Sequence, residues 1–258
     1  MKTIIVGVCG TIEDAQIIKE AGYNFLECTV TSLMPEDDQQ FDAIWEKYKK
    51  CPLPIETCNI LLPGDLPVTG PNVETARIRS YIDTAMHRVK MIGADTVVFG
   101  SGKARSFPEG FSKIEAEAQI IVFLTMVAQV IEPLHITLVI EPLNKKESNI
   151  INSVPEAIEL AKKISHPSIQ VLADLYHMEE EKEPLSHLIT AKDCLKHVHV
   201  ADSGRMAPGR GTYPYREFKQ YLAEAGYNNR ISIECEWNHV EQELKDAKAF
   251  LDTVFHDH

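Results

Sequence analysis

The most restrictive feature of this 258-residue chain is a regular alternation of two kinds of segment. Short runs rich in β-branched residues, typical of buried strands, are separated by longer runs in which apolar residues recur at helical spacing. One such pair takes about 32 residues. Chains of this kind form a mainly parallel sheet, because each helix carries the chain back to the edge where the next strand begins. The eight strands that we expect cover residues 4–8, 25–28, 55–59, 96–99, 137–140, 169–172, 197–200 and 231–235.

Polar residues mark several boundaries of the expected helices. Ser112 and Ser153 each precede a glutamate by three residues, which is the capping-box spacing. Asn72 is the expected N-cap of the helix that ends just before Gly93, and Pro214 is placed to start the helix after strand seven.

Eight strand-and-helix units predict an α/β fold of the (β/α)8 TIM barrel type, a single domain over residues 1–258. A doubly wound open sheet is the alternative, but Gly7 and Gly10 are too few glycines for its phosphate-binding turn. The sequence contains no linker, low-complexity stretch or repeat that would divide it. The long loop 61–71 follows strand three on the face where barrel active sites form.

Composition excludes several classes of protein. A net charge of −12 argues against sequence-independent binding of nucleic acid or of an anionic membrane. The apolar run at residues 4–9 is too short for a signal peptide, and no segment approaches the roughly 18 apolar residues of a membrane span. Six cysteines without a C-x-x-C pair favour reduced thiols. We therefore expect a soluble, cytoplasmic protein.

Metal-ligand residue types stand at or near the ends of the last four expected strands: Glu141, Asp174, His199 and Glu234. They are 33, 25 and 35 residues apart, so each comes from a different strand-and-helix unit. In a barrel these side chains meet at one mouth, where three unpaired carboxylates would repel one another. The set therefore predicts a divalent cation, and oxygen-rich ligation with one nitrogen suits Mn²⁺, Mg²⁺ or Co²⁺.

Three other titratable residues lie near these strand ends and are not counted among the ligands. His197 has the parity of His199 but lies deeper, so we expect it inside the barrel and not among the ligands. Asp202 is interpreted as a loop residue with local hydrogen bonds. For Glu27, at the end of strand two, a structural role and a substrate contact both stay open.

These segments resemble the xylose isomerase-like TIM barrel superfamily, and within it the D-tagatose (ketose) 3-epimerases. The resemblance covers almost the whole chain. The motifs that carry it are Glu141-Pro-Leu-Asn144, Asp174-Leu-Tyr-His177, His199 followed by Arg205 and Pro208-Gly-Arg-Gly211, and Glu234.

The resemblance implies a metal-dependent sugar epimerase. One divalent ion, Mn²⁺ first and otherwise Mg²⁺, Co²⁺ or Zn²⁺, would be held by Glu141, Asp174, His199 and Glu234. The sugar would be contacted by Glu147, His177 and Arg205 at its carbonyl end, and by Asn59.

The implied reaction is C3 epimerisation of a ketose through a cis-enediolate, with Glu141 and Glu234 as the acid and base on opposite faces. Aldose–ketose isomerisation and inosose-type dehydration stay open as alternatives, because the same metal site serves both. An apurinic endonuclease is disfavoured, since strands three and four end in Asn59 and Gly100-Ser101 where it needs histidines. A non-catalytic sugar-binding barrel is a further alternative.

The far end of the substrate is expected near the loop 100–108. Its cations Lys103 and Arg105 are predicted to meet an anionic or strongly polar group, and Trp237 with Phe107 to wall the pocket. The expected partner is a small sugar or sugar derivative, with no nucleic acid and no membrane. Assembly into a homodimer or homotetramer stays open.

Overall fold

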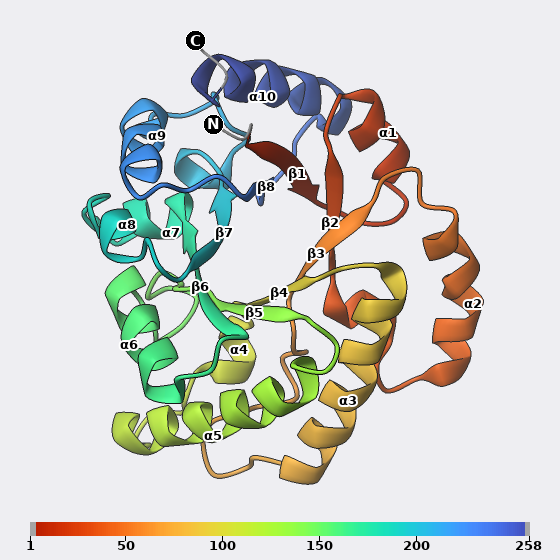
Figure 1. The fold of residues 1–258 in the computed structure, drawn as a ribbon, viewed down its shortest axis with the longest axis vertical. Coiled ribbons are helices and arrows are strands. Elements are labelled where there is room, and N and C mark those ends of the chain that lie inside the picture. The colour runs from red at the N-terminus through yellow and green to blue at the C-terminus, as the bar shows by residue number, and fades with distance from the viewer. Residues whose placement is uncertain (1–3, 256–258) are drawn as a thin grey trace.

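A computed structural model describes residues 4–255 and shows a closed barrel of eight parallel strands, each paired with its neighbours in chain order (Figure 1). The last strand closes the barrel by pairing with the first, with Ile5 opposite Arg230 and Val8 opposite Ile233. The strands are β1 (Ile5–Cys9), β2 (Phe25–Thr29), β3 (Ile55–Asn59), β4 (Thr96–Phe99), β5 (Thr137–Ile140), β6 (Ile169–Asp174), β7 (Leu195–Val200) and β8 (Arg230–Ile233).

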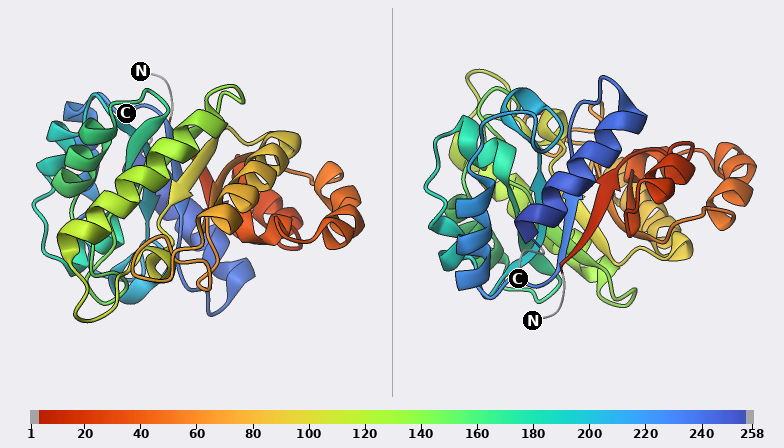
Figure 2. Two further views of the ribbon diagram at one scale, coloured as in Figure 1. Left: turned by 90° about the horizontal axis from the view of Figure 1, so that it is seen from below. Right: turned by 90° about the horizontal axis from the view of Figure 1, so that it is seen from above.

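Helices surround this barrel on all sides (Figure 1), and in both side views α2 stands furthest out from the ring (Figure 2). The helices are α1 (Ala15–Glu20), α2 (Asp38–Lys49), α3 (Thr75–Ile92), α4 (Gly102–Arg105), α5 (Lys113–Ile131), α6 (Val154–Ile164), α7 (Leu175–Glu180), α8 (His187–Thr190), α9 (Tyr215–Glu224) and α10 (Val240–Phe255), with the 3₁₀ turns η1 (Val30–Leu33) and η2 (Ser203–Arg205). The predicted (β/α)8 architecture is confirmed.

The strand predictions are correct to within two residues at every boundary. The last strand is shorter than expected and ends at Ile233, so Glu234 follows it directly. Both predicted serine caps are present, because Ser112 accepts from the backbone N–H of Glu115 and Ser153 from that of Glu156. The predicted cap Asn72 is wrong: α3 begins at Thr75, three residues later.

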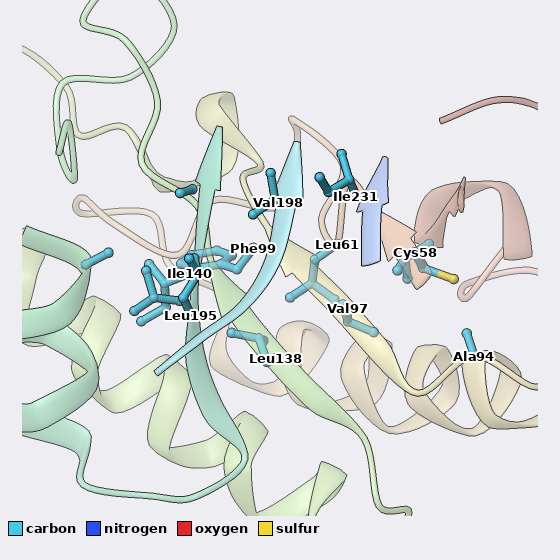
Figure 3. Close-up of a cluster of buried hydrophobic side chains, with 14 of the residues drawn as sticks. Cys58, Leu61, Ala94, Val97, Phe99, Leu138, Ile140, Leu195, Val198 and Ile231 are labelled. Carbon is cyan, nitrogen blue, oxygen red and sulfur yellow. The ribbon is translucent and has the colours of Figure 1, made fainter. Parts of the chain in front are cut away.

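The apolar core fills the space between the barrel and its helices (Figure 3). Side chains alternate along each strand, so Val97 and Phe99 of β4 face the helices whereas Val98 belongs to a small separate cluster with Val139 and Leu172. On the opposite strands the buried set includes polar residues, namely Glu27, Thr57, His197, His199 and Ser232. The inside of the barrel is therefore apolar on β4 to β6 and polar on β2, β3, β7 and β8.

One helix among the described residues, α5, is long and apolar enough to cross a membrane by length and composition alone. Its apolar window is 44% buried inside the structure, and core helices of barrels pass the same test. The packing of Ile120, Leu124 and Val127 into the core accounts for much of its apolar composition.

Candidate active site

The structure brings the four predicted ligand residues together at the carboxyl ends of β5 to β8. One donor atom from each of these side chains lies within 4.8 Å of the others: Glu141, Asp174, His199 and Glu234. Asp174 ends β6 and His199 lies in β7, whereas Glu141 and Glu234 are the first residues after β5 and β8. The carboxylates come from three different strands, so the barrel and not a local motif creates the cluster.

The donor set suits a divalent cation. Burial, and next the charge of Glu141, raise the pKa of Asp174 to about 7, so the ionised form of this carboxyl is disfavoured without a positive partner. A Cβ atom placed on Gly100 would come within 2.1 Å of Glu141 Oε2, so only a glycine leaves room for this carboxylate. Three carboxylate oxygens and one imidazole nitrogen match the ligand preference of Mn²⁺, Mg²⁺ or Co²⁺.

A buried glutamate behind the cluster orients its histidine. Glu27 is fully buried and its Oε1 lies 2.9 Å from His199 Nε2, while His199 Nδ1 lies 3.1 Å from Glu141 Oε1. His199 therefore presents Nδ1 to the cluster, with Nε2 held from behind in the way that carboxylates hold metal-binding histidines. Burial opposes protonation of His199, but the negative charges around it, Glu27 first, together with the hydrogen bond to Glu141 keep the pKa of His199 well above its usual value.

Glu27 belongs to a network that the sequence did not reveal. Its Oε2 lies 2.8 Å from His197 Nε2 and accepts hydrogen bonds of 2.6 Å from the hydroxyls of Thr57 and Ser232. His197 is fully buried, as predicted, and of the two roles left open for Glu27 the structure supports the structural one. A signal was available: inward-facing polar residues on four different strands of one barrel must satisfy one another.

Arg205 links the cluster to the rim of the mouth. Its Nη1 donates to Glu147 Oε1 at 2.8 Å and its Nη2 donates to Glu234 Oε2 at 2.9 Å, while Asn59 Nδ2 donates to Glu234 Oε1 at 2.8 Å. The guanidinium carbon lies 4.9 Å from the centre of the Tyr176 ring. Of the predicted sugar contacts, Arg205 and Asn59 therefore bind Glu234 directly, and Glu147 is linked to it through Arg205.

The glycine-rich loop after β7 holds Arg205 in place. Asp202 is buried and accepts from the backbone N–H groups of Ser203, Gly209 and Tyr213 at 2.8, 3.0 and 3.0 Å, which agrees with its predicted local role. A Cβ atom on Gly211 would lie 2.2 Å from Ser203 Oγ, so the loop closes tightly only because this residue is glycine.

His177 is poised to donate a hydrogen bond. Its Nδ1 accepts from the backbone N–H of Asn144 at 3.1 Å, so Nε2 carries the proton of the neutral ring. Burial lowers the pKa of His177 to about 3, which keeps the ring neutral. Nε2 is buried, 3.9 Å from Asp174 Oδ2, and has no hydrogen-bond partner within residues 4–255. This N–H is the only free polar group of the ring, and a substrate oxygen would satisfy it.

The prediction that Arg105 contacts the substrate is wrong. Its side chain is fully buried, and Nη1 donates to the carbonyl oxygens of Phe99 and Glu141 at 2.8 and 2.7 Å, while Nη2 donates to that of Ile151 at 3.3 Å. Burial lowers the pKa of Arg105 to about 10, and no carboxylate bonds to it among the described residues. Arg105 instead supports the backbone from which Glu141 projects.

The other two far-end predictions have different outcomes. Lys103 is exposed and lines the mouth of the barrel, as expected. Trp237 is half-buried, packs against the apolar core together with Phe107, and lines neither of the cavities described next, so its predicted place in the pocket wall is wrong. The segment after β8 is tied to the loop after β7, because the backbone N–H of Glu236 donates to the carbonyl oxygen of Arg205 at 2.8 Å.

Two adjoining cavities open at the cluster. The first, of about 250 Å³, lies toward β3, β4 and β5 and is lined by residues that include Lys103, Glu141 and Glu147. The second, of about 460 Å³, lies toward β1, β2 and α2. The residues that line both are Asn59, Ile60, Arg205 and Glu234.

Known proteins share this architecture and parts of the sequence. The D-psicose 3-epimerase of Ruminiclostridium cellulolyticum is 34% identical over 109 residues, which are 42% of this chain and 37% of the relative. The D-psicose 3-epimerase of Enterocloster bolteae is 28% identical over 145 residues, 54% of this chain and 48% of the relative, so these matches span less than half of the relatives' own length.

The same fold is seen in a solved structure of D-psicose 3-epimerase with D-tagatose from Clostridium cellulolyticum H10. It superimposes with a TM-score of 0.83 at 19% identity, over 99% of each chain. The family model described as xylose isomerase-like TIM barrel matches residues 15–254. This chain therefore belongs to the xylose isomerase-like TIM barrel family.

Proposed function

We propose that this chain is a divalent-metal-dependent sugar epimerase that inverts C3 of a ketose. The observation that carries the proposal is the pair of glutamates Glu141 and Glu234, which reach one cluster from β5 and β8. Epimerisation needs one group to remove a proton from carbon and another to return it on the opposite face. Relatives that are D-psicose 3-epimerases by name support the choice of a ketose.

Glu141, Asp174, His199 and Glu234 would hold the cation, with Mn²⁺ first and Mg²⁺, Co²⁺ or Zn²⁺ as the other candidates. When bound there, a divalent cation supplies a Lewis acid that polarises the sugar carbonyl.

The protein residues move the proton. Either Glu141 or Glu234 removes the proton at C3 to give a cis-enediolate, and the other returns a proton to the opposite face, so the two exchange roles in the reverse reaction. Arg205 and Asn59 hold both oxygens of Glu234 at 2.8–2.9 Å and so fix its direction.

Hydrogen-bond donors stabilise the charge that develops on the sugar oxygen. The buried Nε2–H of His177 is already free of protein partners within the described chain, and the guanidinium of Arg205 adds a positive charge beside it. Glu147 positions Arg205 through a hydrogen bond of 2.8 Å.

The test is carbon-bound hydrogen exchange in D₂O, followed by NMR, with Mn²⁺ and a panel of ketoses. We expect deuterium at C3. Glu141→Gln and Glu234→Gln should each slow the exchange by about 100-fold or more, while Glu159→Gln, at an exposed position on α6, should not change it.

Each other outcome has a defined meaning. Deuterium at C1 of the ketose or C2 of an aldose would assign aldose–ketose isomerisation instead. Full exchange after metal removal, or wild-type exchange in either glutamine variant, would contradict the proposed mechanism. No incorporation with any sugar would overturn the epimerase and favour a dehydratase or a binding protein.

A further inference from the structure

We propose that the substrate is a keto sugar that carries a second, uncharged sugar ring through a glycosidic bond, and that this ring occupies the 460 Å³ cavity beside α2. The inference rests on the proposed function, because that function places the reacting sugar at Glu141 and Glu234. It adds the class of substrate.

The two cavities lie on different sides of the ligand cluster. Glu234, Arg205, Asn59 and Ile60 line both, so the cavities meet at the ligand cluster and extend from it in different directions. The smaller cavity, at about 250 Å³, falls below the usual range of about 300–1,000 Å³ for pockets that enclose drug-sized ligands and suits one small sugar. A single ketose at Glu141 and Glu234 would fill the smaller cavity, and most of the larger one, at about 460 Å³, would remain open for a second ring.

The lining of the larger cavity selects an uncharged ring. Apolar side chains from four segments line it: Ile12, Met34, Ile44 and Ile60. Its lysine, Lys47, is paired with Glu13 at 2.9 Å, and its arginine, Arg205, is paired with Glu147 and Glu234. A phosphate or carboxylate would therefore find no cation in this wall that is free of a carboxylate.

Hydroxyl groups supply the remaining contacts. Thr11, Thr29, Ser32 and Tyr48 line the same cavity. A sugar ring has apolar C–H faces and hydroxyls at its edges, so a wall of isoleucine, methionine and hydroxyl side chains matches both of its surfaces. These hydroxyls are held in place by the protein, since Thr11 donates to Asp14 at 2.6 Å and Ser32 lies 2.8 Å from the Tyr48 hydroxyl. Their oxygens keep lone pairs that can accept from the hydroxyls of a sugar.

The backbone of this wall is held in an unusual conformation. Ile60 has φ +43° and Met34 has φ +48°, although a β-branched residue such as isoleucine strongly avoids positive φ. Ile60 is also 44% exposed and lines both cavities. Such strain persists where the surroundings impose it and is concentrated at ligand sites.

Buried contacts hold this wall in place before any ligand binds. Arg88 of α3 is buried, donates to the carbonyl oxygen of Leu33 at 2.9 Å and to that of Met34, and lies over the Phe41 ring at 4.1 Å. The turn that contains Met34 is therefore fixed from the core side, which is the arrangement of a preorganised subsite.

The test measures binding and catalysis separately on the Mn²⁺-loaded protein. Calorimetry compares D-fructose with isomaltulose and maltulose, in which a glucose ring is attached to O6 or O4 of fructose. We expect at least one of the disaccharides to bind about tenfold tighter than fructose, because the second ring adds contacts remote from the reacting carbon.

Variants on α2 provide the structural control. Ile44→Trp fills the larger cavity and should abolish the preference for the disaccharide while fructose affinity stays within about twofold. Ala43→Trp places the same side chain at the neighbouring exposed position and should preserve the preference. Ile44→Ala, which enlarges the cavity, should weaken disaccharide binding and provides a second measurement if the tryptophan variant is unfolded by circular dichroism.

The outcomes separate this inference from the proposed function. Equal affinity for fructose and both disaccharides, a preference that survives Ile44→Trp, or tighter binding of fructose 6-phosphate would each overturn the second-ring subsite. Exchange at C3 of fructose with no disaccharide preference would contradict the subsite alone. Tight disaccharide binding without exchange on any sugar would contradict the epimerase alone.

Discussion

At the scale of single residues, the chemistry of the mouth depends on which polar atoms already have partners. His177 and Arg105 are both buried cationic residue types, yet they differ in this respect. The Arg105 guanidinium donates to backbone carbonyl oxygens, whereas one N–H of His177 has no protein partner within residues 4–255. A free buried donor costs stability unless a ligand satisfies it, so we propose His177, and not Arg105, as the residue that faces the substrate.

Replacing Arg105 should therefore damage the fold before it damages binding. Arg105→Met leaves the carbonyl oxygens of Phe99, Glu141 and Ile151 without this donor and should lower the free energy of unfolding by about 3 kcal/mol. Urea denaturation followed by circular dichroism measures this change. Lys103→Met, two residues earlier and exposed, should change it by less than about 0.5 kcal/mol. Equal stability of the two variants would show that the buried contacts are unimportant.

At the scale of elements, local sequence patterns decide where strands and helices begin and end. The eight strand segments were predictable because β-branched runs of four to six residues separate helical patterns throughout the chain. The prediction failed at Asn72, since segment 71–74 forms a turn and α3 starts only at Thr75. A capping residue type is common in turns, so it predicts a helix start only when a continuous apolar pattern follows at once.

The cap of α6 can be tested directly. Ser153 Oγ accepts from the backbone N–H of Glu156, and Ser153→Ala should lower the free energy of unfolding by about 1 kcal/mol. Ser186 occupies the same position before α8 without a side-chain cap hydrogen bond, so Ser186→Ala should have less than half of this effect. Thermal and urea unfolding of both variants measure the difference. A loss in Ser186→Ala as large as that in Ser153→Ala would contradict the assignment.

At the scale of the whole molecule, the ligand cluster ties four strands together. Glu141, Asp174, His199 and Glu234 come from consecutive units of the barrel, so a cation held by all four binds the folded chain and not the unfolded one. Stability should then depend on metal concentration.

Mn²⁺ at 100 times its Kd should raise the free energy of unfolding by about 2.7 kcal/mol, and the Tm by about 5–10 °C for a domain of this size. Asp174→Asn should abolish this increase, and Asp246→Asn, at an exposed position on α10, should preserve it. Differential scanning calorimetry with and without EDTA measures both. An increase that persists in Asp174→Asn would place the metal elsewhere.

The sequence by itself determined the order of strands and helices, the barrel, and which residue types stand at the strand ends. These properties are local or follow from periodicity: side chains alternate along a strand, and parallel strands end at one edge. Glu141, Asp174, His199 and Glu234 could therefore be selected without coordinates, and the structure brings them together.

Only the tertiary structure decided what surrounds them. Two of the three carbonyl acceptors of the Arg105 guanidinium lie 36 and 46 residues further along the chain, and Glu27 contacts His197 and His199 from 170 and 172 residues away. These hydrogen bonds cannot be predicted from sequence periodicity. The cavity beside α2 cannot be predicted in this way either, because its wall combines several distant segments. Burial and hydrogen-bond satisfaction are properties of the assembled chain, so the roles of Arg105, Trp237 and Glu27 could be assigned only after folding had placed their neighbours.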